Sequence, residues 1–194
     1  MVEPESATVK PKHVPGEDEP GPRHEGKVTI RRGDLGDAPA VMTMFDRTVE
    51  WLVANDRADQ WGTEPWSVDP QKVERIRQMI ANGDLWIAEL EGSHAGALIL
   101  SEEPMPYIEP ATEPELYVQL LLTDPALRGH QVGARLLDHA KGEARTRGVA
   151  LLRVDCFAGG DGKLVRYYES QGFTPVSRFE VKGWPGQLLA QRVR

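Results

Sequence analysis

The chain has 194 residues, of which 40% are hydrophobic and 27% are charged, values typical of a folded globular protein. Its net charge is −7 at pH 7 and it has no block of lysine and arginine, which argues against nucleic-acid binding and suits a cationic substrate. No apolar stretch approaches the roughly 20 residues that cross a bilayer, and the first residues lack a signal-peptide pattern, so the sequence indicates neither membrane insertion nor secretion.

The start of the chain differs in composition from the rest. Residues 1–26 contain five prolines and no aromatic residue, so they cannot bury enough apolar surface to offset the conformational entropy of folding. We therefore expect a disordered tail over residues 1–26 and one folded domain over residues 27–194. The single cysteine, Cys156, excludes an internal disulfide and favours a cytoplasmic location.

The domain is predicted to begin with a strand and two helices. Residues 27–32 alternate between apolar and polar side chains, which predicts a strand. Residues 36–56 carry a helical apolar stripe, with Asp37 as a candidate N-cap. A loop rich in Trp, Gly and Pro separates this helix from a second one over residues 71–83. The stripe expected to face the core consists of Val41, Met44, Phe45, Val49, Leu52 and Val53.

Strands and helices then alternate to the end of the chain. Residues 84–90 and 94–102 predict a hairpin, and the apolar run in residues 114–123 predicts a strand at the centre of a sheet. The longest helix, over residues 131–147, is expected to bury Val132, Leu136, Leu137, Ala140 and Ala144. A strand, a helix and a closing strand follow at residues 150–157, 162–171 and 187–193. This order predicts a mixed α/β fold: a central sheet, helices on both faces and one parallel strand–helix–strand crossover.

Residues 128–133, Arg-Gly-His-Gln-Val-Gly, stand where the long helix begins. The first backbone N–H groups of a helix have no internal partner and carry partial positive charge, so they can bind phosphate. Gly129 and Gly133 would let the backbone approach closely, and Arg128 adds charge. Neither the Gly-Lys-Ser/Thr ending of a nucleotide loop nor the Gly-x-Gly-x-x-Gly dinucleotide motif is present. A glycine-containing connection with ordinary solvated arginines is the alternative interpretation.

Two motifs and the order of elements resemble the GNAT acyltransferases. The run LLLTDPALRGHQVGARLL, residues 120–137, is similar to the family's loop Gln/Arg-x-x-Gly-x-Gly/Ala, with Gln131 standing where the family usually has glycine. The later LVRYYESQGF, residues 164–173, matches the second motif, with Asp161 in place of the usual asparagine. Asp161 would also be a natural helix cap.

The resemblance implies a GNAT-like domain over residues 27–194, with a mostly antiparallel mixed sheet, that binds acetyl-CoA. It also implies that the strand ending at Leu122 separates from its neighbour, so that the Leu122 N–H can polarise a thioester carbonyl. Tyr168 is then the candidate general acid, or else a core residue. The residues implied to bind coenzyme A are Leu120, Leu121, Leu122, Arg128, Gly129, His130, Gln131, Val132, Gly133, Ala134, Asp161 and Tyr168.

The acceptor side is less defined. Glu115 and Asp155 are alternative candidates for a general base that deprotonates the amine. Either residue could instead be only a solvated charge at the end of a strand. The amine can also lose its proton to solvent, so a dedicated base is not obligatory. The acceptor pocket is expected between the first two helices and the sheet, with tryptophan rings forming an apolar or cation-binding wall, or packing in the core. No metal site is expected. The candidate acceptor residues are Trp51, Trp61, Trp66, Tyr117, Gln119 and Asp155.

The favoured function is transfer of an acetyl group from acetyl-CoA to a primary amine of a small molecule or peptide. The alternatives are a catalytically inactive module that binds acyl-CoA, and an acyltransferase that uses a longer acyl chain or acts on proteins. The identity of the amine and the formation of a homodimer stay open at this stage.

Overall fold

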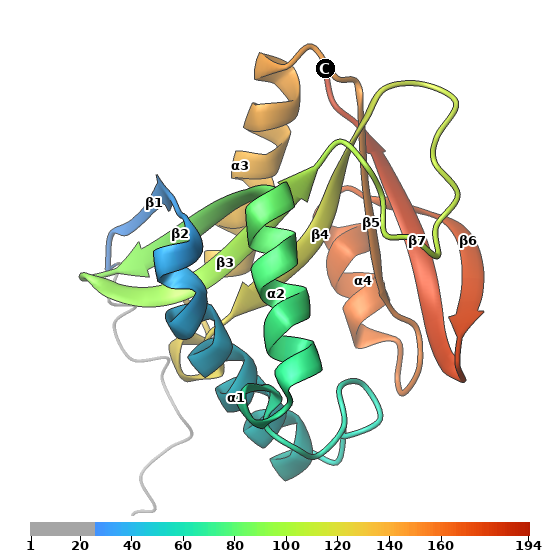
Figure 1. Cartoon of the computed structure of the whole chain (residues 1–194). Coiled ribbons are helices and arrows are strands. Elements are labelled where there is room, and N and C mark those ends of the chain that lie inside the picture. The colour runs from blue at the N-terminus through green and yellow to red at the C-terminus, as the bar shows by residue number, and fades with distance from the viewer. Residues whose placement is uncertain (1–25) are drawn as a thin grey trace, which may run out of the picture.

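A computed structural model of the chain describes residues 26–194, so nearly all of the predicted tail lies outside the described residues. One twisted sheet runs through this part of the chain, in the strand order β1-β2-β3-β4-β5-β7-β6 (Figure 1). The strands are β1 (Val28–Arg32), β2 (Asp84–Leu90), β3 (Ser93–Ser101), β4 (Glu115–Thr123), β5 (Leu151–Phe157), β6 (Thr174–Val181) and β7 (Trp184–Arg192). The α-helices are α1 (Ala38–Ala54), α2 (Pro70–Asn82), α3 (Val132–Thr146) and α4 (Lys163–Ser170).

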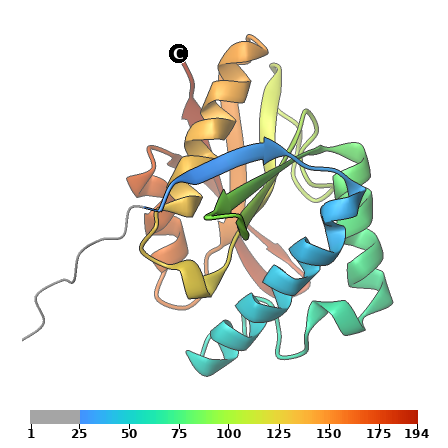
Figure 2. The same cartoon turned by 90° about the vertical axis from the view of Figure 1, so that its left-hand side faces the viewer.

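The predicted fold class is confirmed. Every neighbouring strand pair is antiparallel except β4 and β5, which are parallel and are connected through α3. Helices cover both faces of the sheet: α1 and α2 lie on one side and α3 and α4 on the other (Figure 2). No helix within residues 26–194 is long and apolar enough to cross a membrane.

The core lies on both faces of the sheet because each helix buries one stripe. The stripe predicted for α3 is buried in full, and each of its leucines contributes about 1.5–3 kcal/mol by leaving water. On α1 the predicted stripe is also buried, except that Val53, one residue before the end of the helix, is 41% exposed. Asp37 was expected to cap α1, but its carboxylate pairs with Arg31 and caps no α1 backbone N–H.

Strand β6 was not predicted from the sequence. It lies at the edge of the sheet, where it pairs only with β7. Its side chains are mostly exposed, and Pro175 stands near its start. An edge strand that buries little of either face has no apolar alternation, so the periodicity that reveals the other strands is missing here.

The feature that creates a site is a split between β4 and β5. Their parallel pairing covers only four residues of each strand and ends at Val118 and Val154. Beyond these residues both strands continue but diverge (Figure 1). The register between β3 and β4 also shifts here, which leaves Gln119 as the extra residue of a β-bulge. A bulge bends its strand, so β4 turns away from β5 and a gap forms between the two strands.

Candidate active site

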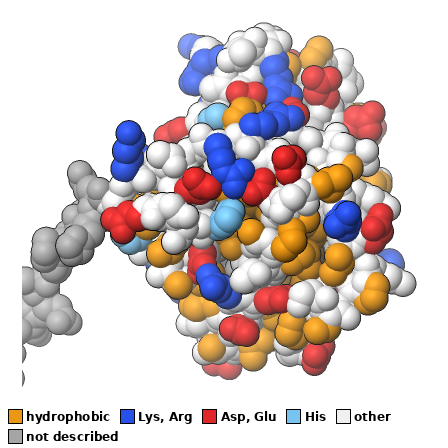
Figure 3. All heavy atoms as spheres, turned by 60° about the vertical axis from the view of Figure 1, so that its left-hand side comes forward, with side chains coloured by type: hydrophobic (Ala, Val, Ile, Leu, Met, Phe, Trp, Pro, Cys, Tyr) orange, Lys and Arg blue, Asp and Glu red, His pale blue; other side chains and the backbone are white. Residues whose placement is uncertain are grey.

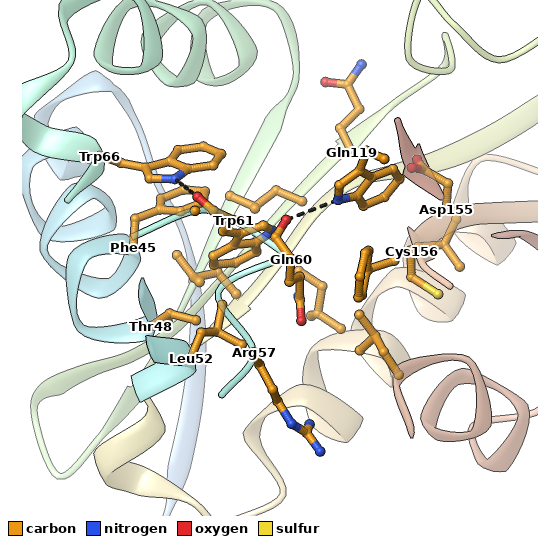
Figure 4. Close-up of a pocket in the computed structure, with 18 of the residues that line it drawn as sticks. Phe45, Thr48, Leu52, Arg57, Gln60, Trp61, Trp66, Gln119, Asp155 and Cys156 are labelled. Atoms are coloured by element: carbon orange, nitrogen blue, oxygen red, sulfur yellow. Dashed lines mark hydrogen bonds between the residues drawn. The ribbon is translucent and has the colours of Figure 1, made fainter. Parts of the chain in front are cut away.

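A cavity of about 950 Å³ fills the split. Its wall comes from α1, the α1–α2 loop, α2, the β3–β4 loop, the diverging ends of β4 and β5, the β4–α3 connection, α4 and the β6–β7 turn. Figure 4 shows Phe45, Trp61 and Trp66 on one side of this space and Gln119, Asp155 and Cys156 on the other. The cavity therefore lies at the only point in the described sheet where neighbouring strands separate.

The exposed edge of β4 offers backbone donors to this cavity. Asp124 N–H donates to the Ala95 carbonyl over 2.9 Å, and the register is continuous from there back through Leu122. Alternate residues of an antiparallel strand point their N–H groups the same way, so the Leu122 N–H also points toward β3. The N–H groups of Leu121 and Thr123 then point into the split. The Leu122 N–H, which was predicted to polarise a thioester, therefore points toward β3 and not into the split.

Cationic side chains gather at one end of the cavity. The Arg128 guanidinium carbon lies 3.6 Å from the centre of the Trp51 ring, a cation–π contact that leaves the N–H edge free. Arg57 lies over the same ring at 5.9 Å, and Lys163 also lines the cavity. Trp51 was predicted to contact the acceptor, but the structure places it beside the predicted phosphate loop.

The loop before α3 has an unusual backbone at the point where it departs from the family motif. Gln131 has φ +56° and ψ +26°, a left-handed conformation that glycine adopts without strain. Gly133 is required for a different reason, because a Cβ atom there would lie 2.5 Å from the Tyr167 hydroxyl oxygen. Of residues 128–134, only Arg128 lines the cavity itself. The other loop residues named for coenzyme binding stay predictions.

Asp161 contacts the start of α4 and does not line the cavity. Its carboxylate accepts a hydrogen bond from the Lys163 N–H and forms ion pairs with the Lys163 ammonium and with Arg57, each at 3.0 Å. The hydrogen bond from Lys163 lowers the pKa of Asp161 below its usual value. Asp161 does not line the cavity, so its contacts support the helix-cap interpretation. Its pair with Arg57 joins the α1–α2 loop to α4 across the mouth of the split.

Tyr168 reaches the cavity from the face covered by α3 and α4. Its side chain is buried beside Cys156 and edge-on to Tyr167 and Phe173. Burial raises the pKa of Tyr168 well above its ordinary value, with smaller contributions from Cys156 and Tyr167. The phenol is therefore protonated at neutral pH, as a proton donor must be. Burial likewise raises the pKa of Cys156 to about 12, which leaves this thiol unreactive.

The other two predicted tryptophans do line the cavity together. The Trp66 ring stacks on Phe45 with 4.3 Å between centroids, and Trp61 tilts against both rings. Trp66 Nε1 donates to the Trp61 carbonyl at 3.4 Å. The cluster is both core and cavity wall, so the two interpretations of these residues do not exclude each other.

Asp155 lies at the vertex of the split, one residue past the last β4–β5 pair. The Tyr117 hydroxyl donates to its Oδ1 at 2.6 Å and the Tyr107 hydroxyl donates to its Oδ2 at 3.2 Å. Burial raises the pKa of Asp155, although both phenol hydrogen bonds lower it. Tyr117 is fully buried behind the cavity and does not line it, whereas Gln119 does.

Glu115 was the first candidate for a general base, and its position argues against that role. Both of its oxygens accept from Arg153 Nη1 at 3.0 Å, and Oε1 also accepts from the Ala111 N–H at 2.8 Å. The carboxylate is 5% exposed and does not line the cavity. It lies where β4 and β5 are still paired, so this ion pair is structural.

Several cavity residues escaped the sequence analysis. Tyr107 comes from the long β3–β4 loop and Trp184 from the β6–β7 turn, neither of which has a periodic pattern. Trp184 Nε1 donates to the Gln60 carbonyl at 3.0 Å, and this hydrogen bond connects the β6–β7 turn to the α1–α2 loop. Arg57, Asp59 and Gln60 also line the cavity, and they belong to the tryptophan-rich loop after α1 that the sequence analysis singled out.

Two wider features of the described residues bear on function. Within residues 26–194, no group of three or more His, Cys, Asp or Glu side chains is arranged to hold a metal ion. On the face drawn in Figure 3, acidic and basic side chains are interspersed, without a continuous basic area.

Comparison with known proteins agrees with this architecture. Residues 47–173, more than half of the chain, match the model of the acetyltransferase (GNAT) family. No curated protein matches the sequence.

Solved structures share the fold at low sequence identity. A GNAT-family acetyltransferase from Listeria monocytogenes is 20% identical, with a TM-score of 0.65 over 85% of this chain and 94% of that one. A candidate phosphinothricin N-acetyltransferase is 24% identical, with a TM-score of 0.63 over 87% and 99%. The yncA protein of Salmonella typhimurium, whose structure contains acetyl-CoA, is 17% identical, with a TM-score of 0.59 over 86% and 94%. Because the family model matches more than half of its residues, this chain belongs to the GNAT family of acetyltransferases.

Proposed function

We propose that this protein transfers the acetyl group of acetyl-CoA to a primary amine by direct attack of the amine nitrogen. The observation that carries the proposal is the split between β4 and β5, where free backbone donors of β4 border a cavity with cations at one end. Acetyl-CoA supplies an activated acyl thioester on a long arm that ends in phosphates. The cavity offers matching chemistry for each of these parts.

The phosphate end is supported by charge and by helix geometry. Arg128, Arg57 and Lys163 line the cavity near the start of α3. The N–H groups of the first turn of α3 carry the partial positive charge of the helix dipole. Two glycines, Gly129 and Gly133, expose the backbone beside them. Arg57 and Lys163 are both paired with Asp161, whereas no carboxylate among the described residues pairs with Arg128, so Arg128 and the N–H groups of α3 would bind the diphosphate most directly.

The reaction end is supported by donors that are in place before substrate binds. The N–H groups of Leu121 and Thr123 point into the split, and each correctly placed donor to a developing oxyanion contributes about 3 kcal/mol. Tyr168 keeps its phenol proton at neutral pH and lies on the face where a leaving sulfur would need it. We assign Tyr168 the role of proton donor.

Calorimetry with acetyl-CoA tests the first half of the proposal. Arg128→Ala should weaken acetyl-CoA binding about 10- to 150-fold, because it removes a charge-assisted contact worth about 1.5–3 kcal/mol. Arg135→Ala is the matched control: Arg135 is an exposed arginine on α3 that does not line the cavity, and its loss should leave binding unchanged. Equal weakening in both variants, or no binding by the wild type, would contradict the proposed phosphate site.

Release of free thiol in the presence of primary amines tests the second half. Tyr168→Phe should lower turnover by about 10²-fold or more while acetyl-CoA affinity is retained, because the ring stays and only the proton donor is lost. Unchanged turnover in this variant would remove Tyr168 as the acid. Binding of acetyl-CoA without thiol release from any amine would instead support an inactive coenzyme-binding module.

A further inference from the structure

Asp155 lines the cavity at the point where β4 and β5 begin to separate, which is where an acceptor amine would bind. It is the first residue of β5 beyond the last pair with β4, and it lines the cavity. Successive side chains of a strand point to opposite faces. Cys156 packs with Tyr168 on the α3–α4 face. Asp155 accordingly faces the side of α1 and α2, opposite the proposed proton donor.

The hydrogen-bond partners of Asp155 carry no positive charge, and the nearest cation that acts on it is Arg75 on α2. Both partners, Tyr117 and Tyr107, are neutral phenols. Among the described residues, no lysine or arginine lies within 4.0 Å of this carboxylate. Glu115, two residues before Tyr117 on the same face, is instead fully paired with Arg153. A partly buried carboxylate without a direct ion pair is costly, so the site is suited to bind a cation.

We propose that Asp155 binds the ammonium group of the acceptor and accepts its proton, and that Tyr117 is a positioning residue that holds the carboxylate for this task. The inference rests on the proposed acetyl transfer and adds its base and the charge state of its substrate. The acceptor is then a primary amine that is cationic in solution. Its remaining part faces a largely apolar wall that includes Met105, Trp61 and Trp184.

The proton balance of the step is complete with these residues. The nitrogen of the bound ammonium gives one proton to the Asp155 carboxylate, which frees its lone pair to form the C–N bond. The C–S bond breaks and its electron pair leaves on sulfur. The acylated nitrogen loses its second proton to water, the sulfur takes a proton from Tyr168, and the Tyr168 phenolate regains one from water. Asp155 finally returns its proton to water, so the reaction releases one proton overall.

The surroundings of Asp155 determine how the rate depends on pH. Burial raises the pKa of this carboxyl, whereas the hydrogen bonds from Tyr117 and Tyr107 and the charge of Arg75 on α2 lower it. Cys156 is protonated at neutral pH because burial and the nearby carboxylate raise its pKa. Tyr168 on α4 is likewise neutral. The base is active when ionised, so kcat/KM should rise with pH through the Asp155 pKa and then level off.

The test compares Asp155→Asn with Asp59→Asn. Asp59 is also a carboxylate that lines the cavity, but it is exposed and lies on the α1–α2 loop. Acetyl-CoA is used with a panel of primary amines: phenethylamine, hexylamine, putrescine and methionine amide. Asp155→Asn should lower kcat/KM about 10²–10⁴-fold with acetyl-CoA affinity unchanged, and Asp59→Asn should change it less than threefold. Equal effects of the two substitutions, or full activity of Asp155→Asn, would overturn the inference.

Tyr117→Phe separates positioning from a merely structural role. The ring stays in the core and only the 2.6 Å hydrogen bond to Asp155 is lost. Because that bond lowers the pKa of Asp155, its loss should move the acidic limb of the kcat/KM profile to higher pH while the plateau is largely recovered. An unshifted limb would exclude the positioning role. A wild type that binds acetyl-CoA but acetylates no amine would overturn the proposed function, and a wild type that is active beside a fully active Asp155→Asn would overturn only this inference.

Discussion

Replacement of Gln131 by glycine should stabilise the protein, although it removes a side chain. The left-handed backbone at Gln131 costs roughly 1–2 kcal/mol for a residue with a Cβ atom. Glycine relieves this strain but loses about 0.4–1 kcal/mol through the greater freedom of the unfolded chain. The Gln131 side chain is exposed and makes no capping hydrogen bond, so no contact offsets the gain. The net stabilisation is about 1 kcal/mol, or ~2–4 °C in Tm for a chain of this length.

Thermal and guanidinium unfolding, followed by circular dichroism, measure this change. Two control variants separate backbone strain from side-chain loss. Gln131→Ala removes the side chain but keeps the Cβ atom, so it should not raise Tm. His130→Gly places glycine one residue earlier, where φ is not positive, and should cost about 0.4–1 kcal/mol. Gln131→Gly with a Tm equal to or below that of Gln131→Ala would refute the reasoning.

The remaining predictions concern packing, ion pairs and pH. Gly133→Ala should destabilise the protein by about 1–3 kcal/mol because its Cβ meets the Tyr167 hydroxyl, and addition of Tyr167→Phe should restore much of the loss in a double-mutant cycle of urea midpoints. Glu115→Gln should cost about 3–5 kcal/mol by leaving Arg153 buried without an ionic partner, while the pH profile of activity keeps its shape; a shifted acidic limb would instead assign Glu115 to catalysis. Asp37→Asn should cost no more than about 1 kcal/mol at pH 7, since the arginine partner is well exposed. The pKa of Asp37 is lowered from 3.8 to about 2, chiefly by the hydrogen bond from that arginine, so the difference in unfolding free energy between wild type and variant should be full above pH 3.8 and disappear toward pH 2.

The sequence alone determined the elements whose signal is local. The stripe of α3 repeats with the helical period, and all five residues predicted to face inward are buried. The turn between β2 and β3 was predicted from Glu-Gly-Ser, and Glu91 and Gly92 both have positive φ there, as a tight hairpin turn requires. The central position of β4 followed from its apolar run. These signals depend on neighbours a few residues apart, so a single sequence contains them.

The tertiary structure decided which groups face the cavity. Glu115 and Asp155 are both acids on neighbouring strands, and only the length of the β4–β5 pairing shows that one is enclosed by Arg153 and the other lies at the vertex. The bulge at Gln119 resets the alternation of β4, which moves the free N–H groups to Leu121 and Thr123. Strand β6 exists because β7 offers it an edge. Each outcome depends on pairing between distant segments, and the free energy of that pairing is not encoded in any local run of residues.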